Sequence, residues 1–258
     1  MSVPRGTLGT VLGWPLALDL RVNSGSQPKT VPFRKRSPWN GTEGRLNEPA
    51  AHIADLLEGG LEEVGVRDRE LARRLASLVE LLFAWSGRIN LTGHRDRESI
   101  ARGLVLDSLG LASLIPDAPS VVDLGSGAGF PGLPIALTRP ACRVTLVESR
   151  VKRHHFQRAA IRELAIGNVD ARLGRAEVLE PTLHRVAVAM AVGSLEELIP
   201  WLMRWLEPGG LALVPIRRGS EPPRIHGATA LGVRSYRVPG GGAERWVWMG
   251  SKDATQRP

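Results

Sequence analysis

One stretch of this chain constrains its fold more than any other: SVVDLGSGAGFPGLPIAL, residues 120–137. Its first five residues are mostly apolar and include two β-branched valines, which is typical of a buried strand. Pro131 then opens a helical segment, at a position where its missing N–H costs little. Between the two, Gly125, Gly127 and Gly129 permit positive φ and let a ligand approach bare backbone. The order predicts the first half of a βαβ unit with a ligand-binding bend.

The pattern after residue 120 alternates between the two kinds of element. Strands are predicted over 121–124, 143–148, 169–173, 185–192 and 211–216, and helices over 131–138, 150–165 and 194–206. Such alternation predicts an α/β fold with a doubly wound parallel sheet. Residues 233–238 and 244–250, joined by PGGG, then predict a β-hairpin. A parallel sheet ended by an antiparallel hairpin is the Rossmann-like layout of the class I S-adenosylmethionine-dependent methyltransferases.

The part before the sheet divides in two. Residues 1–46 are rich in Pro, Gly, Ser and basic residues, and we expect a disordered tail there. Residues 47–117 predict a small helical subdomain, in which one helix face carries Leu71, Leu75, Leu78, Val79, Leu82 and Phe83 and Asp96 is an N-cap. We expect a methyltransferase domain over 118–251 and a short tail over 252–258.

Amino-acid composition limits the kinds of binding partner that this chain can have. The net charge of +8 and pI of about 10.8 favour an anionic partner such as nucleic acid, or else an arginine-rich surface without one. The single cysteine, Cys142, rules out a disulfide within the chain, and Cys and His residues lack metal-ligand spacing. No apolar run reaches the ~18 residues of a membrane span. We therefore expect a cytoplasmic protein, a monomer, without a metal and without a membrane association.

Three ligands compete for the glycine bend. A P-loop requires Gly-Lys-Ser/Thr, and the lysine is missing. A dinucleotide site requires G-x-G-x-x-G, whereas the spacing here is G-x-G-x-G with Phe130 in place of the third glycine. S-adenosylmethionine needs close backbone approach without a phosphate cradle, and Asp123 suits its ammonium group indirectly. Glu148, 23 residues after Gly125, ends the second strand, where an acid accepts hydrogen bonds from ribose hydroxyls or is simply solvated. Bend spacing and layout favour S-adenosylmethionine.

Motifs that the sequence lacks limit which kind of atom can accept the methyl group. Methylation of an exocyclic amine goes with an Asn/Asp-Pro-Pro-aromatic motif after the fourth strand, where this chain has VAVAMAVGSL. Methylation of pyrimidine C5 needs a cysteine nucleophile, and Cys142 lies before the second strand, far from the expected site. An unprotonated ring nitrogen such as guanine N7 needs neither, because its lone pair attacks the methyl group directly.

Five stretches resemble one known family in order and spacing: INLTGHRDRESIARGLVLDSL, VVDLGSGAGFPGLPIAL, LVESRVKRHHF, GRAE and ERWVWM. They are similar to the bacterial 16S rRNA guanine-N7 methyltransferases, the RsmG or GidB family, over about residues 48–250. The resemblance implies S-adenosylmethionine as cofactor and 16S rRNA or the small ribosomal subunit as partner, with guanine 527 as the family's target.

The resemblance also implies roles for individual residues. Those implied at the cofactor are Gly125, Ser126, Gly127, Gly129 and Phe130 in the loop, Glu148 at the ribose, and Ala176 and Glu177 beside the adenine. Those implied at the RNA are Lys152, Arg153, Arg175 and Arg218, and the candidates for a catalytic role are Arg175, Arg218 and Arg245. Each cation has a plainer alternative as a solvated or ion-paired surface residue.

Two departures from the family stand out. Gly103 and Leu104 occupy the positions of an Arg-His pair, and Met190 stands where the family has an arginine after the fourth strand. These departures keep open a non-catalytic RNA-binding relative of the same fold. A small-molecule methyltransferase is the other alternative, and it predicts an apolar substrate pocket without a basic surface.

Overall fold

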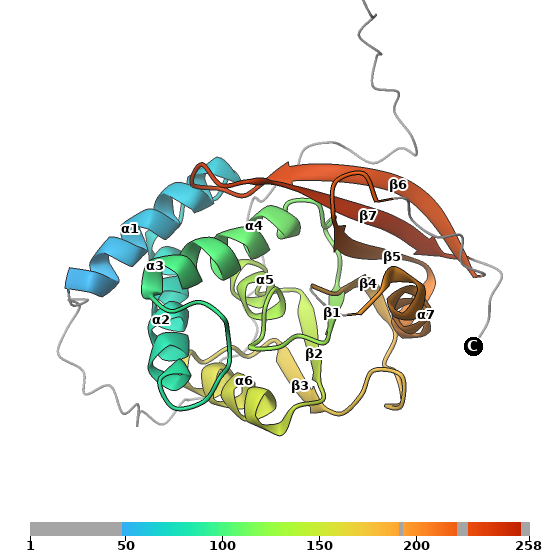
Figure 1. Cartoon of the computed structure of the whole chain (residues 1–258), viewed down its shortest axis with the longest axis horizontal. Helices are drawn as coiled ribbons and strands as arrows, with labels where there is room; N and C mark the ends of the chain where they lie inside the picture. Colours follow the sequence, from blue (N-terminus) through green and yellow to red (C-terminus); the bar gives the residue numbers. More distant parts are fainter. Residues whose placement is uncertain (1–47, 191–192, 221–226, 254–258) are drawn as a thin grey trace, which may run out of the picture.

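The computed structural model describes residues 48–190, 193–220 and 227–253. The predicted disordered tail, residues 1–46, lies outside these ranges. Seven strands form one sheet in the order β3-β2-β1-β4-β5-β7-β6 (Figure 1). Their bounds are β1 Ser120–Leu124, β2 Arg143–Glu148, β3 Val169–Leu173, β4 His184–Val188, β5 Leu206–Ile216, β6 Ala228–Arg237 and β7 Glu244–Lys252.

The sheet combines both strand orientations. β3, β2, β1, β4 and β5 run parallel, β7 pairs antiparallel with β5, and β6 pairs antiparallel with β7. In β1, Val121 and Val122 pair with Val144 and Thr145 of β2. The predicted doubly wound sheet with a terminal hairpin is confirmed, and its parallel strands all end at the edge that carries the glycine loop.

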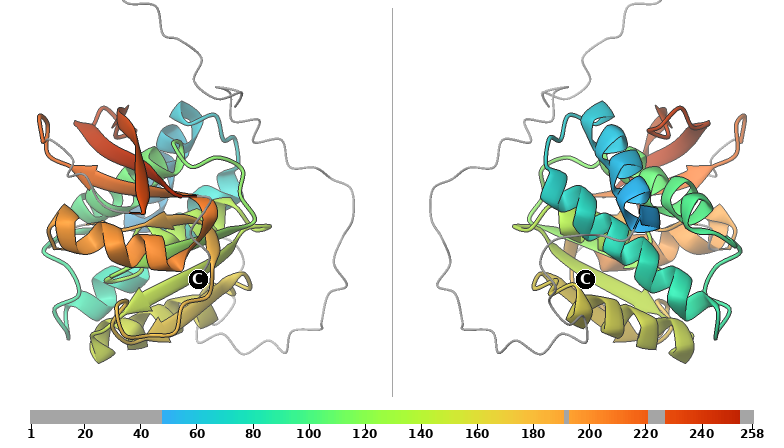
Figure 2. Two further views of the ribbon diagram at one scale, coloured as in Figure 1. Left: turned by 90° about the vertical axis from the view of Figure 1, so that its right-hand side faces the viewer. Right: turned by 90° about the vertical axis from the view of Figure 1, so that its left-hand side faces the viewer.

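The helices lie on both faces of this sheet (Figure 2). Their bounds are α1 Glu48–Glu63, α2 Arg69–Ser86, α3 Arg97–Ile100, α4 Asp107–Ala112, α5 Gly132–Thr138, α6 Val151–Glu163 and α7 Leu195–Trp205, with a π-helical segment, η1, at Ala101–Leu106 between α3 and α4. No helix in the described ranges is long and apolar enough to cross a membrane.

Alternate residues of the central strands build two apolar cores. Val121 and Val186 face the helices α1 to α6 in one cluster, and their neighbours Val122 and Ala187 face α7 in the other. The first cluster runs from Ile53 to Val247, so the N-terminal helices and the sheet share one core. The period-two alternation of the central strands thus buries apolar side chains on both faces.

Capping residues fix where the N-terminal helices begin. Asp68 accepts a hydrogen bond from the Leu71 N–H at 2.9 Å, and Asp96 accepts one from the Ser99 N–H at 2.8 Å. Asp96 is therefore the N-cap that the sequence predicts. The predicted helix face of α2 is buried from Leu71 to Leu82. Phe83 is only half-buried, and the Arg97 guanidinium lies 4.0 Å from its ring centroid.

Three predicted strand boundaries are wrong by four residues or more, and one of them is the start of β6, which lies at Ala228 rather than at residue 233. β4 ends at Val188 rather than at residue 192, and residues 191–192 lie outside the described ranges. β5 begins at Leu206, immediately after α7, rather than at residue 211. The sequence Glu-Pro-Gly-Gly at 207–210 favours a turn, but pairing of Leu206 with His184 extends the strand across it. The register shifts between His184 and Val186, and the extra residues lie in β5.

Candidate functional site

The bend after β1 is closed by its own backbone hydrogen bonds. The N–H groups of Gly125 and Ser126 donate to the Val147 carbonyl at 2.8 and 3.0 Å, and those of Gly129 and Phe130 donate to the Ser126 carbonyl at 2.7 and 3.0 Å. Gly125, Gly127 and Gly129 have φ of 69°, 57° and 89°. All three lie in the left-handed region that side chains disfavour, which is why the chain places glycine at every second position.

Glu148 links the end of β2 to this loop. Its side chain is almost completely buried, and its Oε2 accepts a hydrogen bond from the Gly127 N–H at 2.8 Å. Its Oε1 accepts one from the Arg150 N–H at 2.7 Å, and Arg153 Nη1 lies 3.9 Å from Oε2. Each carboxylate oxygen keeps acceptor capacity beyond these bonds. The predicted ribose acceptor is therefore held rigidly against the predicted ligand loop.

The room around each glycine of the loop shows where a ligand could lie against the backbone. A Cβ on Gly127 would have no neighbour closer than Arg153 Nη1 at 3.9 Å, whereas one on Gly129 would collide with Leu133 at 2.4 Å and one on Gly132 with Leu146 at 2.2 Å. Gly129 and Gly132 thus allow close packing within the protein, and Gly127 alone of these three borders open space. The arrangement fits a cofactor that lies on the Gly127 backbone with its ribose toward Glu148.

Gln157 of α6 holds the glycine loop by hydrogen bonds. It is fully buried, and its Nε2 donates to Ser126 Oγ and to the Gly127 carbonyl, both at 2.8 Å. Its Oε1 is buried without a hydrogen-bond partner among the described residues. The Gln157 amide therefore fixes the position of the glycine loop relative to α6. The sequence patterns did not single out this residue, although its spacing of four from Arg153 places both on one side of the helix.

Asp123 holds the start of α5. It is fully buried, and its Oδ2 accepts a hydrogen bond from the Gly132 N–H at 2.9 Å. Burial raises its pKa to about 7, and the charge of Glu148 acts in the same direction, against the bond from Gly132. Because Oδ1 is also buried, with no partner among the described residues, Asp123 acts on the site through the loop rather than by direct contact.

The predicted adenine-side pair follows β3. Ala176 is buried, and its carbonyl accepts a hydrogen bond from Trp205 Nε1 at 3.0 Å. The Glu177 carbonyl accepts one from Arg204 at 2.8 Å, so α7 holds this turn in place. Arg175 is exposed and lies 3.5 Å from the Glu177 carboxylate. The two carbonyls are fixed, while the acidic side chain is occupied by an exposed ion pair.

The three candidate catalytic arginines are not brought together. Arg175 follows β3, whereas Arg218 follows β5 and Arg245 lies at the start of β7. In the sheet order β3 and β7 are five strand spacings apart, or about 24 Å. Arg245 is 3.4 Å from Asp107, and Arg218 lies over the ring of Trp246 at 5.3 Å. Arg175 is therefore too distant to share a site with the other two.

The two predicted RNA-facing cations of α6 differ from each other. Lys152 is exposed and has no carboxylate partner in the described part of the chain. Arg153, in contrast, is directed at Glu148 and over Gly127. Phe130 also differs from its loop neighbours, since its side chain is buried in the larger core. The geometry therefore places Arg153 beside Glu148 and Gly127 and leaves Lys152 exposed at the start of α6.

The three residues that depart from the family pattern, Gly103, Leu104 and Met190, all pack against neighbouring side chains. A Cβ on Gly103 would meet the His94 ring at 2.3 Å, so the imidazole from the loop before α3 covers this glycine. Leu104 is half-buried, and its carbonyl accepts a hydrogen bond from Ser108 Oγ at the π-helical segment. Met190 is half-buried and packs against the larger core. No described group of three or more Cys, His, Asp or Glu side chains is arranged to hold a metal ion.

The sheet order, the glycine loop after β1 and the acid that ends β2 together define a class I methyltransferase of the S-adenosylmethionine-dependent type. Comparison with protein families narrows this class. The chain belongs to the rRNA small subunit methyltransferase G family, whose model matches residues 71–221.

Curated relatives agree with this assignment. A protein named ribosomal RNA small subunit methyltransferase G from Xanthomonas campestris pv. campestris (strain 8004) is 36% identical over 206 residues, which cover 78% of this chain and 96% of the relative. The protein of the same name from Stenotrophomonas maltophilia (strain R551-3) is 38% identical over 164 residues, or 63% of this chain and 76% of the relative.

Solved structures give only distant matches. Cofactor-bound Rv0187 from MTB has 18% identity and a TM-score of 0.48 over 83% of this chain and all of the matched chain. A putative methyltransferase, yhhF, from Escherichia coli has 21% identity and a TM-score of 0.46 over 64% of this chain and 91% of the matched one. The fold assignment rests on the sheet order and the family match instead.

Proposed function

We propose that this chain transfers a methyl group from S-adenosylmethionine to N7 of a guanine in 16S rRNA, the family's guanine 527. The observation that carries the proposal is that the family match spans both the Gly127 loop and Glu148, which the structure joins by one hydrogen bond. The net charge of +8 agrees with a nucleic-acid partner and argues against the small-molecule alternative.

The chain's own residues supply binding and orientation. The Gly127 backbone and Glu148 border the open space above the loop, and the carboxylate is the acceptor for ribose hydroxyls. Ala176 and Glu177 provide a fixed turn for the adenine side. When bound, the cofactor supplies an electrophilic methyl group whose carbon–sulfur bond breaks as the bond to nitrogen forms.

The acceptor nitrogen makes a general base unnecessary. Guanine N7 carries a lone pair and no proton, so no proton has to leave when the new bond forms. The positive charge moves from the cofactor to the methylated base. The enzyme's task is then to orient the base in line with the methyl group and to exclude other geometries. For this reaction neither Glu148 nor Asp123 has to act as a base.

The basic surface near the carboxyl ends of the strands is proposed to hold the RNA backbone. Lys152, Arg175 and Arg218 are exposed at different points along this edge, and Arg153 is half-buried next to Lys152 on α6. Phosphate contacts release counterions, so RNA binding is expected to weaken strongly with salt. We place the protein in the cytoplasm, where ribosomal subunits are found. We propose a monomer because the exposed large apolar side chains of the described surface are few, and only Leu231 and Val233, both on β6, share an element.

Met190 tests whether the chain is an active enzyme. A methionine there offers apolar contact in place of an arginine's planar donor fork. Since N7 attack needs no base, we expect activity in the natural protein, and we expect Met190→Arg to leave the rate similar or to raise it. The side chain is half-buried, so thermal unfolding of the variant is the necessary control.

The assay is methyl transfer from labelled S-adenosylmethionine to 16S rRNA and to small subunits that lack 7-methylguanosine, followed by digestion to nucleosides. Label in 7-methylguanosine supports the proposal. Label in another nucleoside contradicts the N7 assignment. A natural protein that binds the cofactor but is silent, beside an active Met190→Arg variant, identifies a non-catalytic relative.

A further inference from the structure

A cation and an aromatic ring form an exposed pair at the end of β5. The Arg218 guanidinium lies 5.3 Å from the centroid of the Trp246 ring. Arg218 is exposed and Trp246 is half-buried. Trp246 is the cross-strand partner of Ile216, the last residue of β5, so the ring stands beside the carboxyl end of that strand.

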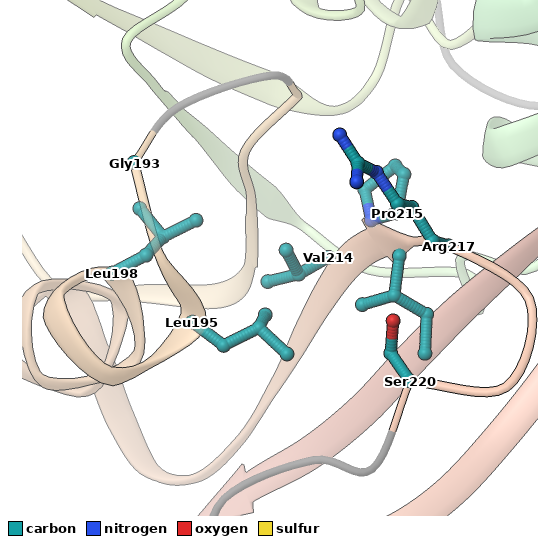
Figure 3. Close-up of a pocket in the computed structure, with 8 residues that line it drawn as sticks. Gly193, Leu195, Leu198, Val214, Pro215, Arg217 and Ser220 are labelled. Atoms are coloured by element: carbon teal, nitrogen blue, oxygen red, sulfur yellow. The ribbon is translucent and has the colours of Figure 1, made fainter.

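An apolar pocket adjoins this pair. It has a volume of about 160 Å³ and lies between the start of α7 and the end of β5. Figure 3 shows Leu195 and Leu198 of α7 facing Val214 of β5, with Arg217 at the mouth. Ile216 also lines the pocket, and Trp246 is its partner on the neighbouring strand β7.

The guanidinium groups of Arg217 and Arg218 have no carboxylate partners within residues 48–190, 193–220 and 227–253. Two adjacent exposed guanidinium groups beside an aromatic ring and an apolar pocket suit a ligand with a flat apolar part and a negative charge. A nucleotide has both parts, since its base is flat and its phosphate is anionic.

The position of the pair relates it to the cofactor loop. In the sheet order β5 is two strands from β1, and both strands end at the same edge. The separation across two strands is about 10 Å. A polynucleotide that presents one base above the loop after β1 therefore passes within reach of Arg218 and Trp246.

We propose that Arg218 and Trp246, with the adjoining pocket, form a stacking platform for an unpaired base of the RNA substrate. The base stacks on the guanidinium and the indole, as unpaired bases stack on aromatic and arginine planes elsewhere. The inference rests on the proposed function, because it takes single-stranded ribosomal RNA as the ligand. It adds a residue-level contact that recognises bases rather than phosphates.

The test separates stacking from charge. Arg218→Lys keeps the positive charge and removes the flat guanidinium. The probe is a short single-stranded RNA oligonucleotide, measured by fluorescence anisotropy over a range of salt concentrations. We expect Arg218→Lys and Trp246→Phe each to weaken binding about fivefold or more, with an unchanged salt slope. The matched control is Arg162→Lys, an exposed arginine in the last turn of α6, away from this surface, and it is expected to bind as the natural protein does.

A second probe removes the base. An oligonucleotide with abasic positions is expected to bind the natural protein and the Arg218→Lys variant with equal affinity. If Arg218→Lys binds the intact oligonucleotide as tightly as the natural protein, the platform is refuted, and Arg218 is a point charge. Calorimetry with S-adenosylmethionine and thermal unfolding show whether Trp246→Phe is folded. Failure of the methyl-transfer assay with preserved base-dependent binding would overturn the proposed function and leave the platform.

Discussion

Glu148→Gln is the substitution that most directly tests the cofactor geometry. The carboxylate accepts hydrogen bonds from two backbone N–H groups at 2.7 and 2.8 Å and is almost completely buried. A glutamine keeps one acceptor oxygen and replaces the other with an NH₂ group. One of these backbone donors then loses its acceptor, which costs about 1–3 kcal/mol of folding stability.

The same change removes a charged acceptor from the ribose. A hydrogen bond to a charged group contributes about 1.5–3 kcal/mol, so the cofactor Kd is expected to rise about 10- to 150-fold. Calorimetry with S-adenosylmethionine measures this, and thermal unfolding confirms that the variant is folded. Glu70→Gln is the matched control, because Glu70 is exposed in the first turn of α2 and has no contact with the site. Unchanged affinity in a folded Glu148→Gln protein would refute the ribose assignment.

Gly127→Ala gives an independent measure of the same site. In the protein itself a Cβ at this position has no neighbour closer than 3.9 Å, so the cost to the fold is limited to the backbone strain of φ 57°. A ligand on the loop would collide with the added methyl group. We therefore expect a modest loss of stability and a large loss of cofactor affinity. A modest loss of stability with full affinity would place the cofactor elsewhere.

Three further outcomes follow from single contacts. Arg153→Ala is expected to weaken cofactor binding only a few-fold, because the ion pair of Arg153 with Glu148 is partly exposed. Lys152→Ala is expected to leave cofactor binding unchanged and to lower RNA affinity. Calorimetry measures the first effect and fluorescence anisotropy the second. Burial raises the pKa of Asp123 to about 7, so its contribution to stability is complete below pH about 4 and is lost as the pH rises through 7. The free energy of unfolding is therefore expected to change by about 4 kcal/mol between these two limits. In urea unfolding of Asp123→Asn this pH-dependent change should be smaller. Tyr236→Phe removes the hydroxyl that donates to buried Asp107 and is expected to cost about 1–3 kcal/mol in denaturant unfolding, with cofactor affinity preserved.

The sequence predicts the framework of this protein because local patterns dictate it. The glycines at every second position require positive φ, and Asp96 acts through a hydrogen bond three residues along the chain. Parallel strands end at one edge, so the strand pattern alone predicts that Gly127 and Glu148 lie near each other. Their direct hydrogen bond follows from the register of β1 with β2.

The contacts that the sequence does not predict join distant parts of the chain. Arg245 pairs with Asp107, 138 positions away, and Gln157 holds a loop about 30 positions away. Nothing local to Arg153 distinguishes it from Lys152, since both begin the same helix, and only the turn of α6 directs one of them at Glu148. Likewise, Trp246 becomes a site residue only when β7 pairs with β5.

The central claim is methylation of guanine N7 in 16S rRNA, and nucleotide-resolution mapping of 7-methylguanosine tests it most directly. The comparison uses 16S rRNA from cells that carry the gene, cells from which it is deleted, and deleted cells that express the natural chain or Glu148→Gln. We predict one 7-methylguanosine position that disappears on deletion, returns with the natural chain and returns weakly or not at all with Glu148→Gln. A 16S rRNA methylation pattern that is identical with and without the gene would contradict the account.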